Sequence, residues 1–177
     1  LHGSNRQIML DLLTKLRHGP LRNLKFLWFL LRFVYRIGLV ITPNWSVSKM
    51  IGPYGPFKLD KRFAFSNFSK WGAGHNRGFV SCVDQATGIH TAFDVGAHIG
   101  LVTLPLSTAI SPGGTVFAFE PGNSNRKFLK QHLRINQIKN VTVIADLIGE
   151  KLDASVNFYQ SSSDSGMNTI TDIGRRK

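Results

Sequence analysis

The chain has 177 residues, of which 42% are hydrophobic and 18% charged, and its formal net charge is +12 at pH 7. This length and apolar share predict one folded domain with an appendage and exclude wholesale disorder. The single cysteine, Cys82, excludes an internal disulfide and has no partner for a metal site, so we expect no metal and a reducing, cytoplasmic setting.

The positive charge is unevenly distributed along the chain. Residues 1–90 contain 13 Lys and Arg against 3 Asp and Glu, a net of +10, whereas residues 91–177 contain 9 against 7, a net of +2. The excess of positive charge in residues 1–90 therefore predicts that this part of the chain binds a surface partner and takes no part in the chemistry.

Residues 1–52 predict an N-terminal helical extension. A helix over 5–18 is followed by a second over 21–41, whose longest uncharged run is far shorter than the ~20 residues of a bilayer span. On the second helix the basic residues share an arc of roughly 80° and leave an apolar, aromatic remainder. These residues are Arg22, Lys25, Arg32 and Arg36. Either this helix lies on an anionic membrane surface, or it packs on the rest of the protein with its charges in water.

Proline and glycine punctuate 42–56, which predicts a linker or a set of turns with a domain boundary near Gly52. The two units would be 1–52 and 53–177. Alternating apolar residues over 57–68 then predict one or two short strands that turn at Asp60.

Residues 71–78 are glycine-rich and polar, which predicts a loop. Its His75 could act as a general base, and a plain exposed histidine is the alternative. Residues 79–87 predict a helix that packs Phe79, Cys82 and Val83 beside the sheet.

Two strands, Thr91–Val95 and Thr115–Phe119, bracket a helix expected over 99–110, in which Pro105 should produce a bend. The apolar first strand is typical of one covered on both faces. A second helix over 125–135, with Arg126, Lys127, Lys130 and Arg134 facing solvent, leads to a third strand over 141–145. Alternating strands and helices with short links predict an α/β fold, half of a doubly wound parallel sheet with strand order 3-2-1.

The turn after the first strand carries the most informative residues. It contains Asp94, Gly96, His98 and Gly100, and the second strand ends at Glu120. A dinucleotide fingerprint would have a further glycine between the two found here, and Asp94 would repel a pyrophosphate but attract an ammonium group. Glu120 could accept both hydroxyl hydrogens of a ribose. S-adenosylmethionine has an ammonium, a sulfonium and a ribose but no phosphate, so these residues favour it; a turn without a ligand is the alternative.

The run FDVGAHIGLVTLPLS, the run VFAFEPGNSNRKFLKQHLRINQIKNVTVI and the short strand SVNFY resemble the FkbM family of S-adenosylmethionine-dependent methyltransferases. The resemblance covers roughly Pro53 to Ile173 and is strongest over Phe93–Tyr159. It implies a class I methyltransferase fold (Rossmann-like) and methylation of oxygen on a sugar or related metabolite. His98 stands where the family more often has Asn.

Asp146 follows the third strand. A carboxylate there could accept a hydrogen bond from the adenine amino group, or it could only begin a turn, since FkbM-like sequences often carry a small residue at this place. No residue of the sequence is identified as the catalytic base.

The resemblance implies a further strand ending in a motif like K-x-D-V-E-G, which the sequence does not contain before Lys177. We therefore expect an N-terminal portion of a methyltransferase, with an unpaired strand edge and an uncovered apolar face that make it prone to association. Two other functions stay open: a nucleic-acid methyltransferase or binding module, suggested by the basic charge, and a non-catalytic adaptor for a membrane or partner.

Overall fold

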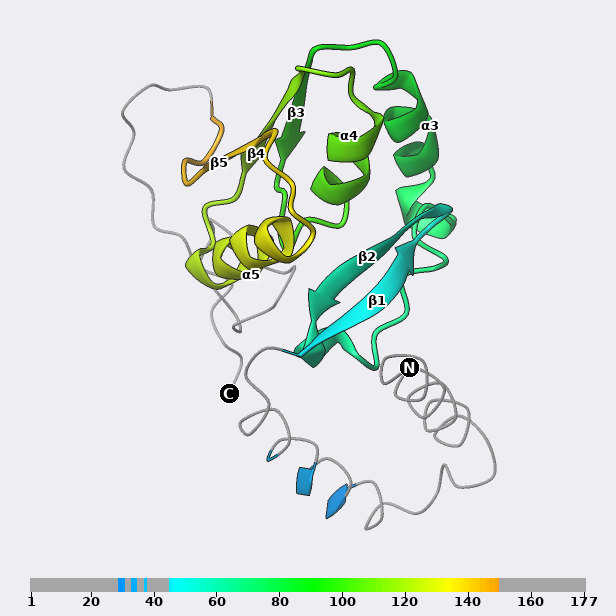
Figure 1. Cartoon of the computed structure of the whole chain (residues 1–177), viewed down its shortest axis with the longest axis vertical. Coiled ribbons are helices and arrows are strands. Elements are labelled where there is room, and N and C mark those ends of the chain that lie inside the picture. The colour runs from blue at the N-terminus through cyan, green and yellow to red at the C-terminus, as the bar shows by residue number, and fades with distance from the viewer. Residues whose placement is uncertain (1–28, 31–32, 35–36, 38–44, 150–177) are drawn as a thin grey trace.

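The computed structural model describes residues 29–30, 33–34, 37 and 45–149 (Figure 1). The expected helix over 5–18 and the strand SVNFY lie outside these residues. In chain order the elements are β1 (Ser46–Ile51), β2 (Tyr54–Asp60), the 3₁₀ helices η2 (Lys61–Phe63) and η3 (Gly74–Asn76), α3 (Gly78–Gln85), β3 (Thr91–Val95), α4 (Thr103–Ala109), β4 (Thr115–Phe119), α5 (Asn123–Ile135) and β5 (Val141–Ile144).

Three parallel strands form the main sheet, in the order β3-β4-β5 (Figure 1). The α/β class and the predicted 3-2-1 order are thus confirmed. On β4, Val116 and Ala118 are fully buried, whereas the alternate residues Phe117 and Phe119 are only half-buried. One face of the sheet is therefore covered, and the other is open along the described part of the chain.

The open face corrects one prediction about β3. Its apolar sequence is typical of a strand covered on both faces, but Phe93 and Val95 are 64% and 62% exposed. In the described sheet β3 pairs only with β4, so it is an edge strand. The uncovered apolar face expected from the sequence is confirmed for these residues.

An antiparallel hairpin replaces the predicted linker. β1 and β2 pair from Ser46 opposite Asp60 to the tight turn at Gly52, so residues 46–56 are mostly strand and residues 61–68 are not. Glycine and proline lie at the turn and at its edges. Pairing between residues that are distant in the sequence determines that the flanking residues form strands. The boundary predicted near Gly52 falls at this turn, and the division into 1–52 and 53–177 stays a prediction.

Three helices differ in detail from their predictions. α4 begins only at Thr103, and Pro105 lies in its first turn, where a missing N–H interrupts no helical bond and no bend is required. α5 begins at Asn123, earlier than predicted. On α3, Phe79 and Val83 are buried as predicted, whereas Cys82 is exposed.

The hydrophobic core joins the hairpin to the sheet. Ile51 and Leu59 of the hairpin, Leu104 of α4 and Leu129 of α5 are all fully buried in one cluster. This packing fixes the hairpin beside α5, close to the turn that follows β3 (Figure 1). Among the described helices, none has the length and apolarity that a bilayer crossing requires.

Candidate functional site

The turn after β3 is folded back onto the end of β4. The N–H groups of Gly96 and Ala97 both donate to the Phe119 carbonyl at 2.9 Å, and the N–H of Gly100 donates to the Ala97 carbonyl at 2.8 Å. The carboxyl ends of two neighbouring parallel strands meet here, which is where doubly wound sheets bind ligands.

Glu120 ties the two strand ends together. Its side chain is 4% exposed. Its Oε2 accepts from the N–H of His98 at 2.8 Å, and its Oε1 accepts from the N–H of Gly122 at 2.8 Å and from Asn125 Nδ2 at 3.4 Å. The carboxylate therefore shapes both loops while holding a negative charge at the edge of the sheet.

Arg126 completes the β4–α5 turn. Its Nη1 donates to the carbonyls of Glu120 and Pro121, both at 2.8 Å. Of the four basic residues predicted to face solvent, Lys127, Lys130 and Arg134 are exposed, whereas Arg126 is half-buried because its guanidinium bonds these carbonyls. The reason is that two carbonyls at the start of the turn have no helical partner, and a guanidinium one helical turn later reaches both.

His98 has a left-handed backbone, with φ of +52°. Among residues other than glycine, Asn, Asp and His are the ones most often found in this region, which explains how the turn tolerates a histidine here. Its ring Nε2 is buried and has no hydrogen-bond partner within the described part of the chain.

Asp94 lies behind the turn and is 8% exposed. Its Oδ2 accepts a hydrogen bond from Thr103 Oγ1 at 2.5 Å. Burial raises the pKa of Asp94, the bonds with Thr103 oppose that rise, and the nearby Glu120 carboxylate adds to it. Thr103 was missed from sequence, because nothing distinguishes it there from Ser107 and Thr108, the other hydroxyl residues of the same helix.

The two glycines of the turn serve different purposes. A Cβ on Gly100 would meet Leu129 Cδ1 of α5 at 2.8 Å, so that glycine is needed for close packing. A Cβ on Gly96 would meet no atom within 4 Å, although φ is +81° there. Gly96 therefore faces open space.

The hydrogen-bond donors and charges together define the chemistry of the site. The N–H groups of Gly96, Ala97, His98 and Gly100 are all engaged inside the protein. Among the described residues, neither Asp94 nor Glu120 forms an ion pair with a lysine or arginine. The turn thus offers buried acceptors and negative charge, which suit hydroxyl groups and a cation and not a phosphate.

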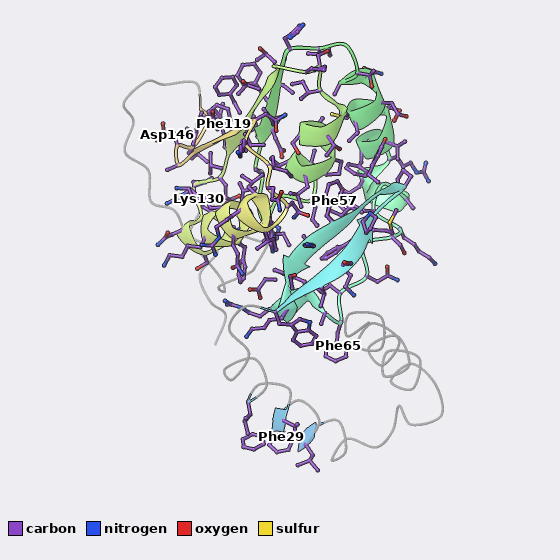
Figure 2. All side chains as sticks on the ribbon, in the orientation of Figure 1. Phe29, Phe57, Phe65, Phe119, Lys130 and Asp146 are labelled. Carbon is purple, nitrogen blue, oxygen red and sulfur yellow. The ribbon has the colours of Figure 1, made fainter. Side chains whose placement is uncertain are left out.

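The remaining candidate residues lie outside the turn after β3. Asp146 is exposed in the loop after β5, and Figure 2 labels it at that end of the strand, with Phe119 at the end of β4. His75 lies in η3, and its side chain is outside what the structure describes. Over the described ranges, no group of three or more His, Cys, Asp or Glu side chains could hold a metal ion.

No family model matches the chain, and no curated protein matches it. Solved structures do. TYW2 from M. jannaschii in complex with AdoMet is 25% identical, with a TM-score of 0.38 over 50% of this chain and 37% of its own. A SAM-dependent methyltransferase from Aquifex aeolicus is 21% identical, with a TM-score of 0.35 over 40% and 37%. Precorrin-6y C5,15-methyltransferase from Geobacter metallireducens is 22% identical, with a TM-score of 0.38 over 46% and 44%.

This chain spans less than half the length of each of those structures.

Proposed function

We propose that this chain binds S-adenosylmethionine and acts as a methyltransferase of the FkbM type, with a hydroxyl group of a sugar or related metabolite as the acceptor. One observation carries the proposal: the N–H groups of Gly96, Ala97, His98 and Gly100 are engaged inside the protein, while two buried carboxylates lie at the same sheet edge. Those four N–H groups would not be free to bind a pyrophosphate, and the two carboxylates would repel it. S-adenosylmethionine, when bound, supplies a methyl group made electrophilic by its sulfonium.

The residues present fit this cofactor. Glu120 accepts three hydrogen bonds from the protein, and a carboxylate has about four acceptor sites, so it retains capacity for a ribose hydroxyl. Asp94 has one oxygen bonded to Thr103, and its buried charge would be stabilised by the ammonium of the methionine part. Gly96 leaves the open space that a ligand needs.

The chain would contribute mainly by positioning. His98 and Gly100 hold the turn in its left-handed course, and Glu120 fixes the turn against β4. Asp146 is exposed near the same edge, and we assign it the adenine amino group. Holding the cofactor in one orientation before the acceptor oxygen arrives is a large part of what such an enzyme supplies.

Isothermal titration of the 177-residue chain with S-adenosylhomocysteine tests the proposal. We expect binding, and we expect Glu120→Gln to weaken it by about tenfold or more, because a hydrogen bond to a charged group contributes ~1.5–3 kcal/mol. Asp84→Asn, an exposed acid on α3, is the matched control and should bind like the natural chain. A thermal melt of each variant establishes that it is folded. Equal affinity of the Glu120→Gln variant, or tighter binding of NAD than of S-adenosylhomocysteine, would overturn the assignment.

We also propose that residues 29–37 contact an anionic membrane surface. The described helical residues there present apolar side chains to solvent: Phe29, Leu30, Phe33, Val34 and Ile37. Phe29 is 68% exposed and Phe33 55%. In the sequence, Arg32 and Arg36 alternate with this apolar set, a composition that suits an interfacial helix over a bilayer with acidic headgroups.

Co-sedimentation with vesicles tests the membrane proposal. The chain should sediment with vesicles rich in phosphatidylserine at low salt, less so at high salt, and little with neutral phosphatidylcholine vesicles. Replacing Phe29 and Phe33 together by serine should abolish sedimentation. A chain that stays in the supernatant with acidic vesicles at low salt would refute this proposal without touching the cofactor assignment.

A further inference from the structure

His132, on α5, connects two segments that are far apart in the sequence. It is fully buried, with an exposed fraction of 0%. Its Nδ1 lies 2.8 Å from the carbonyl oxygen of Ile99, and its Nε2 accepts from the N–H of Asp60 at 2.9 Å. A carbonyl can only accept and an amide N–H can only donate, so the ring is neutral and carries its proton on Nδ1.

One end of this connection is anchored at the hairpin. Asp60, the last residue of β2, is buried, and its Oδ2 accepts from Gln131 Nε2 at 2.8 Å. Its Oδ1 accepts from the N–H of Arg62 at 2.9 Å and from Arg62 Nε at 3.2 Å. Two consecutive residues of α5 thus hold the end of the hairpin: Gln131 bonds the side chain of Asp60, and His132 bonds its backbone N–H.

The other end lies in the cofactor turn. Ile99 sits between His98, whose N–H donates to Glu120, and Gly100, which packs on Leu129 of α5. The hydrogen bond from His132 fixes the Ile99–Gly100 peptide plane, to which the Ile99 carbonyl belongs. The Gly100 N–H of that plane donates to the Ala97 carbonyl, and the Ala97–His98 peptide carries the His98 N–H that donates to Glu120.

We propose that His132 is a positioning residue of the cofactor site: it couples α5 to the turn after β3 and holds Glu120 in its binding geometry through the peptide groups of Ile99 and His98. It touches no cofactor. This inference rests on the proposed function. Core packing alone would also account for a buried histidine at this position, and the inference adds a role in cofactor binding. The packing is real, since the ring stacks on Phe128 at 6.1 Å and meets the edge of Phe63 at 5.6 Å.

Two isosteric variants separate positioning from packing. In His132→Asn, the amide nitrogen replaces Nδ1 and can still donate to Ile99, but nothing replaces Nε2. In His132→Gln, the longer amide reaches the Nε2 position and can accept from Asp60, but the donor to Ile99 is lost. Both variants lose a similar part of the ring and should lose stability to a similar degree.

Isothermal titration with S-adenosylhomocysteine gives the first readout, below the melting temperature of each variant. Positioning predicts that His132→Asn binds within about threefold of the natural chain, whereas His132→Gln binds at least tenfold more weakly. Gln131→Ala is the control, because it loosens the hairpin end without touching Ile99, and it should keep its affinity. Equal affinities for the two histidine variants would overturn the inference.

Amide hydrogen exchange gives a readout that needs no ligand. Peptides covering 96–104 should exchange at least tenfold faster in His132→Gln than in His132→Asn or Gln131→Ala, because the His98 N–H loses its fixed direction. Unchanged exchange there would also overturn the inference. If the natural chain fails to bind S-adenosylhomocysteine while the exchange difference is found, the proposed function fails and the coupling stands.

Discussion

At the scale of single residues, Asp94 lowers the stability of the fold when it is ionised, and its charge serves the proposed cofactor site. Its carboxylate is buried with one hydroxyl partner and lies close to a second carboxylate. Burial raises its pKa above the ordinary 3.8, so the folded state binds the proton more tightly than the unfolded chain does. The stability associated with this group is present below pH 3.8 and is lost as the pH rises through the folded-state pKa.

Asp94→Asn should therefore melt at a higher temperature than the natural chain at pH 7, because the amide keeps an acceptor for Thr103 and carries no buried charge. The same variant should bind S-adenosylhomocysteine about tenfold or more weakly, since a charge-assisted hydrogen bond contributes ~1.5–3 kcal/mol. Calorimetry and titration on one preparation measure both effects. A variant that is more stable and binds equally well would remove Asp94 from the site.

The pH dependence of stability should be dominated in the neutral range by His132. Burial lowers the pKa of His132 below the ordinary 6.5, with the hydrogen bond to Ile99 and the charge of Asp60 opposing that shift. The unfolded chain takes up a proton near pH 6.5 that the folded chain resists, so the free energy of unfolding should fall as the pH drops below 6.5. Denaturation at pH 5.5 and 7.5 measures this slope. His132→Asn should flatten it, and an equal slope in both proteins would contradict the prediction.

At the scale of elements, the turn joins β3 to α4 through two glycines in the left-handed region, of which only Gly100 is packed against another element. The comparison separates backbone conformation from packing. At Gly96 only the positive φ opposes a side chain, whereas at Gly100 the side chain also meets α5.

Gly96→Ala should cost ~1 kcal/mol of unfolding free energy and leave the protein folded. Gly100→Ala should cost ~2–4 kcal/mol, because overpacking adds to the same strain. Urea denaturation measures both. Gly96→Ala should nonetheless weaken S-adenosylhomocysteine binding, since its methyl group enters the open space of the turn. Equal stability of the two variants would show that Leu129 yields without cost.

A side chain also joins β2 to α5 at the far end of that helix. Asn136 Oδ1 accepts from the N–H of Lys58 at 2.8 Å, and its Nδ2 donates to the carbonyl of Lys58 at 2.7 Å. The amide thus pairs with one residue of the strand as a neighbouring strand would. With Asp60 and His132, this contact fixes the hairpin to the helix at two points 4 residues apart on α5.

At the scale of the whole molecule, the open face of the sheet is the feature with the largest consequence. Phe93 stacks on Phe117 with ring centres 5.5 Å apart and on Phe119 at 6.3 Å, so three aromatic rings form one apolar surface beside Val95. β3 is also the outer strand of the described sheet, and an exposed apolar face beside such an edge favours association.

The 177-residue chain should therefore self-associate as its concentration rises. Replacing Phe93 and Val95 together by threonine keeps the strand propensity but removes the apolar surface, and it should increase the monomer fraction. Size-exclusion chromatography with light scattering measures both. The exposed pair Ile89 and Ile148, changed in the same way, is the control. A natural chain that is monomeric at every concentration would contradict this prediction.

The sequence by itself determined the parts of this protein that depend on local pattern. The bounds of β3 and β4 were predicted to the residue, α5 to within two residues, and the parallel order followed from the alternation of elements. The placement of Asp94, Gly96, His98, Gly100 and Glu120 at one sheet edge followed as well, because the carboxyl ends of adjacent parallel strands must meet. Their role with a cofactor stays a prediction.

Only the tertiary structure decided what depends on distant pairing. The hairpin over 46–60 was not predicted, because the glycine and proline residues at its turn are typical of a linker. The contacts of His132 with Asp60 and Ile99 join residues that are 72 and 33 positions apart in the chain. The periodicity of a sequence predicts which face of an element is apolar. It does not predict which polar group of another element will be the hydrogen-bond partner of a buried side chain. A buried hydrogen bond needs both partners in place, and their meeting is fixed by how the hairpin, the turn and α5 pack together.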